Sequence, residues 1–115
     1  MEASAALGEL VALSTQVVEA VIATPDGDVE ASRAASDERA GVLAAAGREL
    51  LHAAAAMRPG DHPVERVHVD LAGGSLVVCS DGKRSIVATT IAEPTAGLVA
   101  YDLRVALRRV RGEAG

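Results

Sequence analysis

Two carboxylates flank a glycine in the segment ATPDGDVEAS at residues 23–32, a spacing that could serve metal binding or acid–base chemistry. A calcium loop of the EF-hand type needs several further oxygen ligands, which are missing here. Proline presets φ at the start of a turn, and Asp-Gly tolerates the positive φ of a tight hairpin. We therefore predict that Asp26 and Asp28 are solvated residues of a turn between two strands.

Three histidines and one cysteine are the other residues that could bind a metal: His52, His62, His68 and Cys79. The histidines are spaced irregularly, and neither an H-E-x-x-H motif nor a cysteine cluster accompanies them. Cys79 lies in an apolar run, where a thiol usually packs as a small hydrophobic group instead of acting as a nucleophile. We expect neither a metal site nor a cofactor.

The serines that could act as nucleophiles, Ser75, Ser80 and Ser85, are expected at strand ends or turns, and no G-x-S-x-G elbow surrounds them. The chain also lacks the G-x-x-x-x-G-K-[ST] loop, so it is not itself a P-loop GTPase. We therefore predict a protein that is not an enzyme.

The composition is that of one small domain covering residues 1–115. Half of the residues are hydrophobic but Tyr101 is the only aromatic one, so the core must consist of many small contacts. The formal charge of -5 and the lack of aromatic stacking platforms argue against a nucleic-acid partner. The arginines near the C-terminus are expected to complement the dipole of a final helix.

The N-terminal residues lack the basic and apolar regions of a secretory leader, and no apolar run is long enough to span a bilayer. We expect a cytoplasmic protein without membrane insertion.

Changes in hydrophobic period predict eight elements in the order α-β-β-α-β-β-β-α, which is an α+β domain with one antiparallel sheet. Pro-Asp-Gly-Asp, Gly-Gly and Asp-Gly mark the hairpins. The middle helix begins with Ser36 as its N-cap, and Pro59-Gly60 ends it. The predicted helices cover residues 3–14, 37–57 and a final segment after Glu93-Pro94; the predicted strands cover residues 17–23, 29–33, 64–71, 75–80 and 85–92.

Two of these elements have a second face without an assigned partner. The strand at 64–71 alternates between apolar and polar residues, as a half-solvated edge strand does. The middle helix has a core stripe that includes Leu43, Gly47, Leu50, Ala54 and Met57. A neighbouring stripe with Ala45, Arg48, His52 and Ala55 is either a helix–helix interface or a solvated surface.

The chain resembles the roadblock or dynein light-chain family over residues 7–110. The resemblance depends on the element order and on the segments VVEAVIATPDGDVEAS at 17–32, VHVDLAGGSLVVCSDGKRSIVATT at 67–90 and AEPTAGLVAYDLRVAL at 92–107. Family members commonly carry a polar residue, then proline, glycine-leucine and tyrosine near the last helix, and Glu93, Pro94, Gly97-Leu98 and Tyr101 match this pattern.

The resemblance implies a five-stranded antiparallel sheet flanked by three helices, a roadblock-like and profilin-like fold. It also implies a homodimer in which the strand after the middle helix pairs with its copy and the middle helices lie alongside each other. Dimerisation would remove the exposed edge. Carried onto this chain, the interface consists of Ala45, Arg48, His52 and Ala55 on the helix and Arg66, Val67, His68, Val69 and Asp70 on the strand.

Bacterial members of the family are associated with small Ras-like GTPases, which implies a regulator or adaptor that acts through protein contacts. No residue of this chain is assigned to contact with the GTPase, and no arginine is assigned a catalytic role. The alternatives are a small-molecule-sensing module and a purely structural dimer in a signalling complex.

Overall fold

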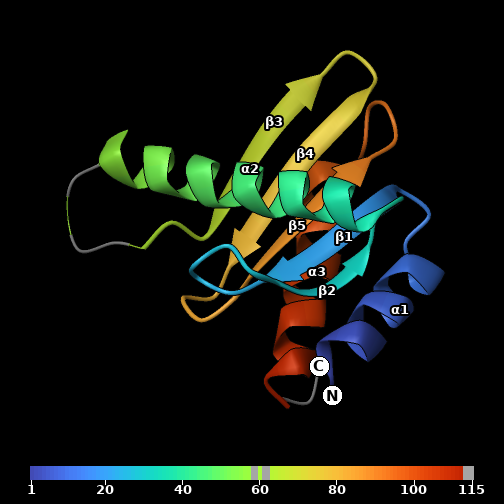
Figure 1. Cartoon of the computed structure of the whole chain (residues 1–115). Helices are drawn as coiled ribbons and strands as arrows, with labels where there is room; N and C mark the ends of the chain where they lie inside the picture. The colour runs from blue at the N-terminus through green and yellow to red at the C-terminus, as the bar shows by residue number, and fades with distance from the viewer. Residues whose placement is uncertain (58–59, 61–62, 113–115) are drawn as a thin grey trace.

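The computed structural model describes residues 1–57, 60 and 63–112, and its elements follow the predicted order (Figure 1). The strands form a single five-stranded antiparallel sheet in the spatial order β2-β1-β5-β4-β3. The elements are α1 (Ala3–Leu13), β1 (Val17–Ala23), β2 (Val29–Arg33), α2 (Asp37–Met57), β3 (Arg66–Leu71), β4 (Gly74–Ser80), β5 (Ser85–Thr90) and α3 (Ala96–Val110).

The helices lie on both faces of the sheet: α2 crosses one face, and α1 and α3 cover the other (Figure 1). Each face therefore has its own apolar cluster. Leu7, Ile22 and Leu103 belong to the cluster between the sheet, α1 and α3. Leu43 and Val87 belong to the cluster beneath α2. This arrangement explains why β4 and β5 are apolar on both faces, as the sequence predicted.

The predicted hairpin turns are confirmed. Gly27 and Gly82 both have φ +89°, the left-handed conformation that glycine adopts without steric cost. Gly74 is needed for a different reason, because a Cβ there would lie 2.2 Å from the carbonyl oxygen of Thr90. These turns place the chain reversals at the two ends of the sheet.

Helix α2 begins as predicted, since the Ser36 hydroxyl accepts a hydrogen bond of 3.1 Å from the Arg39 N–H. Gly47 then allows close packing on the sheet: a Cβ at this position would lie 2.4 Å from Cγ2 of Val87. Met57, predicted on the core face, is instead 78% exposed. Figure 1 gives the reason, since the C-terminal end of α2 extends past the edge of the sheet.

Several predicted boundaries move by one or two residues. Strand β3 begins at Arg66 and not at residue 64, and β5 ends at Thr90 and not at residue 92. Helix α3 begins at Ala96 with Thr95 as its N-cap, so Pro94 precedes the helix and does not lie in its first turn. The predicted stop at Pro59 lies outside the described residues.

None of the helices in the described part of the chain is both long and apolar enough to cross a membrane.

Candidate functional site

Strand β3 is at one edge of the sheet, as its alternating sequence predicted. The Glu65 carbonyl accepts a hydrogen bond of 2.9 Å from the Ser80 N–H, just before the Arg66–Cys79 register position. Because backbone groups alternate in direction along an antiparallel strand, the N–H and C=O groups of Arg66, His68 and Asp70 point away from β4. The outer side of β3 thus presents backbone donors and acceptors that another strand could pair with.

The side chains of Arg66, His68 and Asp70 lie on the sheet face that α1 and α3 cover. The Asp70 carboxylate accepts a hydrogen bond of 2.8 Å from the Ser75 hydroxyl, and its Oδ1 lies 2.8 Å from Nε2 of His68. These hydrogen bonds, first that of Ser75 and then that of His68, hold the pKa of Asp70 below its usual value. Asp70 remains 84% exposed and so stays available to a partner.

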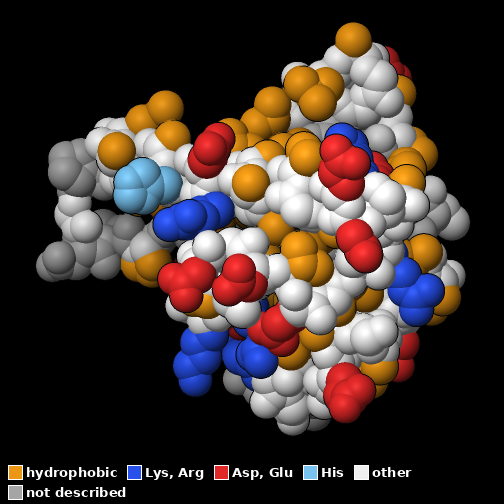
Figure 2. All heavy atoms as spheres, viewed as in Figure 1, with side chains coloured by type: hydrophobic (Ala, Val, Ile, Leu, Met, Phe, Trp, Pro, Cys, Tyr) orange, Lys and Arg blue, Asp and Glu red, His pale blue; other side chains and the backbone are white. Residues whose placement is uncertain are grey.

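The opposite side of β3 faces α2 and is apolar. Val67 and Leu76 pack against the cluster beneath α2, as does Leu50 of the helix. Leu71, at the end of β3, is 63% exposed, and Met57 at the end of α2 is more exposed still. Figure 2 shows hydrophobic side chains along the β3–β4 hairpin and the adjoining side of α2. We call Leu50, Met57, Val67, Val69, Leu71 and Leu76 the apolar patch.

The helical stripe predicted to be an interface lies on the other flank of α2. Arg48, His52 and Ala55 line a pocket of about 410 Å³ between α2, the β1–β2 turn and the β4–β5 turn. Ala45 is exposed on the outer surface of the helix. The structure therefore does not bring this stripe together with the apolar patch, and its place in an interface stays a prediction.

Sequence reasoning assigned Leu50 and Met57 to the core, so it missed the apolar patch. Their helical spacing is the same whether the surface beneath them is the sheet or a second protein. The one available signal was the length of α2, whose 21 residues are more than the sheet can cover.

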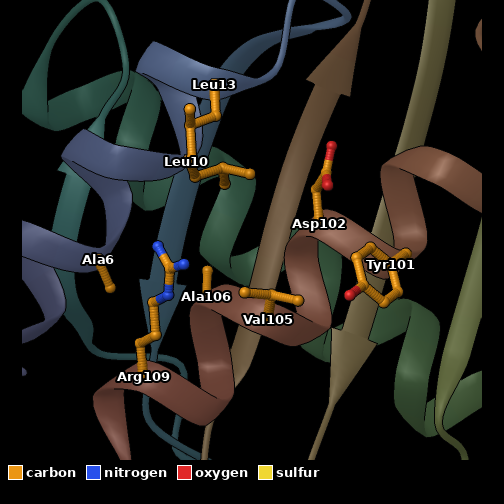
Figure 3. A pocket seen from close by; sticks show the side chains of 8 residues that line it. All are labelled: Ala6, Leu10, Leu13, Tyr101, Asp102, Val105, Ala106 and Arg109. Atoms are coloured by element: carbon orange, nitrogen blue, oxygen red, sulfur yellow. The ribbon is translucent and has the colours of Figure 1, made fainter. Parts of the chain in front are cut away.

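A second, smaller hollow of about 220 Å³ lies between α1 and α3 (Figure 3). Leu10 and Leu13 line it from α1, and Tyr101 and Val105 line it from α3. Arg109 lies at its side and forms an ion pair with Glu9. These side chains make a shallow, largely apolar groove in which no nucleophile is paired with a base.

The residues first considered for chemistry are dispersed. Asp26 and Asp28 are exposed in the β1–β2 turn, as predicted. Cys79 is fully buried in β4, and burial raises the pKa of its thiol. His62 lies outside the described residues. Within the described part of the chain, no three His, Cys, Asp or Glu residues are grouped so that they could hold a metal ion.

No protein-family model matches the chain, and no curated protein matches it in sequence. Solved structures do match. A roadblock/LC7 domain from Streptomyces avermitilis superposes with a TM-score of 0.85 at 22% identity, covering 97% of this chain and 97% of that one. The gliding protein MglB from Thermus thermophilus superposes with a TM-score of 0.74 at 20% identity, covering 97% of this chain and 90% of that one.

The likeness extends to profilin IB of Acanthamoeba castellanii, with a TM-score of 0.53 at 17% identity over 84% of this chain and 86% of that one. The chain therefore has the roadblock fold, with profilin-like neighbours. This confirms the fold that the sequence resemblance implied.

Proposed function

We propose that this chain is a homodimeric regulator or adaptor of a small Ras-like GTPase, acting by protein contact and without a catalytic site of its own. The observation that carries the proposal is the open β3 edge next to the apolar patch. The fold it shares with the gliding protein MglB supports the same conclusion. Its sequence resemblance to roadblock proteins that accompany GTPases supports it as well.

The dimer forms when β3 pairs antiparallel with β3 of a second copy and extends the sheet across both chains. A twofold axis through His68 places Arg66 directly opposite Asp70 of the second copy, on the same face of the sheet. Opposite charges at facing positions of antiparallel strands stabilise pairing, whereas an axis through Arg66 or Asp70 would bring like charges together. The charge pattern of β3 therefore favours the register centred on His68.

The same axis brings the two α2 helices side by side on one face of the extended sheet. The flank that meets the second copy is the one next to the β3–β4 hairpin, which carries the apolar patch. Leu71 and Met57 are 63% and 78% exposed in the single chain. Fully burying a side chain of this kind stabilises by about 1.5–3 kcal/mol. The proposal thus keeps the predicted strand residues Arg66, Val67, His68, Val69 and Asp70 and adds the apolar patch to them. The predicted helical stripe on the other flank of α2 remains a separate prediction.

The experiment is a nucleotide-dependent pull-down of Ras-like GTPases from the same genome, each loaded with GDP or a non-hydrolysable GTP analogue. We expect wild-type protein to retain one of them in a nucleotide-dependent manner and to change its hydrolysis or exchange rate. The His68→Pro variant is expected to bind more weakly, because the dimer presents the binding surface. The His68→Ala variant is the matched control, since it keeps the backbone N–H. Absence of binding in every nucleotide state would sink the GTPase proposal.

A further inference from the structure

The pocket between α2 and the turns of the sheet lies on the other flank of α2 from the apolar patch. Its volume of about 410 Å³ is in the range of small-molecule sites. Four segments of the chain build it: α2, the β1–β2 turn around Thr24, residues 63–64 before β3, and the β4–β5 turn with the strand ends beside it. The pocket opens to solvent, so that a ligand could enter it without local unfolding.

The charge of the pocket opposes that of the whole protein. The chain carries 16 acidic and 11 basic residues. Yet Arg48, Arg84 and His52 line the pocket, and none of the described residues that line it is acidic. Figure 2 shows a histidine and a basic side chain next to each other towards the C-terminal end of α2. Because Glu30 pairs with Arg84, the positive charge that remains in this lining is that of Arg48, and it favours an anionic ligand.

The two arginines differ in how far their charge is already neutralised. Arg84 forms an ion pair of 2.8 Å with Glu30, which fixes its side chain. Arg48 has no ion pair or hydrogen bond with any described residue. Its Cδ lies 3.2 Å from where a Cβ of Gly27 would be, so the stem packs over the turn because residue 27 is a glycine. Arg48 therefore offers an unpaired guanidinium on a supported stem.

A largely buried hydroxyl gives an independent sign of a ligand. Ser85 is only 7% exposed, and its hydroxyl has no hydrogen-bond partner among the described residues. It lies on the same face of β5 as Val87, the face that α2 covers, and it lines the pocket. In the described part of the chain every fully enclosed side-chain oxygen or nitrogen has a partner, so the Ser85 oxygen keeps its small exposure. A ligand oxygen in the pocket would provide the missing partner.

Ser80 stands opposite Ser85 in the β4–β5 register. Its hydroxyl oxygen already accepts a hydrogen bond of 3.2 Å from the Gly82 N–H, which leaves the hydroxyl proton to donate. The pocket thus combines hydroxyl donors from the sheet with a guanidinium from the helix. A phosphate monoester offers three acceptor oxygens to such donors, whereas a carboxylate offers two.

We propose that this pocket binds a small phosphate monoester, with Arg48, Ser80 and Ser85 holding the phosphoryl group. Leu51, Ala55 and Pro25 line the rest of the pocket and provide an apolar surface for the body of the ligand. The inference corresponds to the ligand-sensing alternative, and it does not depend on the dimer or on a GTPase partner.

The test is a titration of the whole chain with phenyl phosphate, followed by amide signals in heteronuclear NMR, with inorganic phosphate in a parallel titration. We expect saturable shifts at Leu51, Gly82 and Ser85, and tighter binding of phenyl phosphate than of inorganic phosphate. The Arg48→Gln variant should bind at least about tenfold more weakly, because a charge-assisted hydrogen bond is lost. The Ser85→Ala variant should also bind more weakly but unfold like wild type, since its hydroxyl has no partner among the described residues.

The Arg104→Gln variant is the matched control, because it removes the same charge from an exposed position on α3 and should leave binding unchanged. Equal weakening by Arg104→Gln and Arg48→Gln would overturn the proposal, since it would indicate a general charge effect. So would the absence of saturable shifts at millimolar phenyl phosphate. A phosphoserine peptide that binds more tightly than phenyl phosphate would contradict the assignment to a free small molecule.

Discussion

Helix α2 approaches the sheet closely at Gly47, and replacing this residue tests the packing on which the fold depends. A Cβ there would lie 2.4 Å from Cγ2 of Val87. Carbon atoms in contact normally lie about 3.5–4.0 Å apart. Val87 is fully buried and β-branched, so it has little freedom to turn away. The Gly47→Ala variant must therefore displace α2 or distort β5.

The expected effect of Gly47→Ala on the free energy of unfolding is the sum of two opposing changes. Alanine in place of a helical glycine stabilises by about 1 kcal/mol. Overpacking a close-packed core costs about 1–3 kcal/mol. Gly41 lies in the same helix, is exposed and would place its Cβ in open space, so Gly41→Ala measures the first change alone. We expect Gly41→Ala to raise the free energy of unfolding. The free energy of unfolding of Gly47→Ala should be about 1–3 kcal/mol lower than that of Gly41→Ala.

The assay is urea unfolding of the three proteins at one fixed protein concentration, because dimerisation makes stability depend on concentration. A double variant, Gly47→Ala with Val87→Ala, provides the internal check. It should show a favourable coupling of about 1 kcal/mol, since the shortened side chain removes the clash. If Gly47→Ala were as stabilising as Gly41→Ala, the close approach of α2 to β5 would be refuted.

Charged side chains and the single thiol provide three further tests. Hydrogen bonds and the charge of Arg39 hold the pKa of Glu19 below its usual value. The ionised Glu19 carboxylate therefore stabilises the folded protein at pH values above the usual pKa, and this stabilisation is lost as pH falls through the lowered folded-state pKa. Wild type should therefore exceed Glu19→Gln by at most about 1 kcal/mol at neutral pH, and urea titrations from about pH 6 to about pH 3 should show the difference shrinking. Cys79 should react with a thiol reagent in the native protein only through unfolding, so labelling at the rate of an exposed thiol would contradict its burial. Arg66→Asp and Asp70→Arg should each weaken the dimer in sedimentation equilibrium, and the double variant should restore it; no restoration would count against the register centred on His68.

The sequence predicted the fold well where the determinants are local. Gly27 and Gly82 carry turn conformations that can be identified from neighbouring residues alone. The alternation along residues 66–71 likewise indicates a half-solvated strand, as an edge strand is. The fold that these elements suggested is the one observed.

What the sequence could not show depends on residues that are distant in the chain. Met57 continues the core stripe of α2, but only the width of the sheet decides that it is exposed. Arg48 shares a stripe with small residues, which made it a candidate for helix pairing. That it has no ion pair among the described residues and lines one pocket with Ser85 appears only once α2 lies across the sheet. For the same reason, no local pattern in the sequence indicates the pocket.

The central claim is that β3 joins two copies of this chain, and the most direct measurement is the molar mass in solution by light scattering after gel filtration. At micromolar concentration wild type should have twice the 11.7 kDa mass of one chain. The His68→Pro variant should be a folded monomer, because proline removes a backbone donor that points away from β4 and leaves the β3–β4 hydrogen bonds in place. A strictly monomeric wild type, or a His68→Pro variant that remains a folded dimer, would contradict the account.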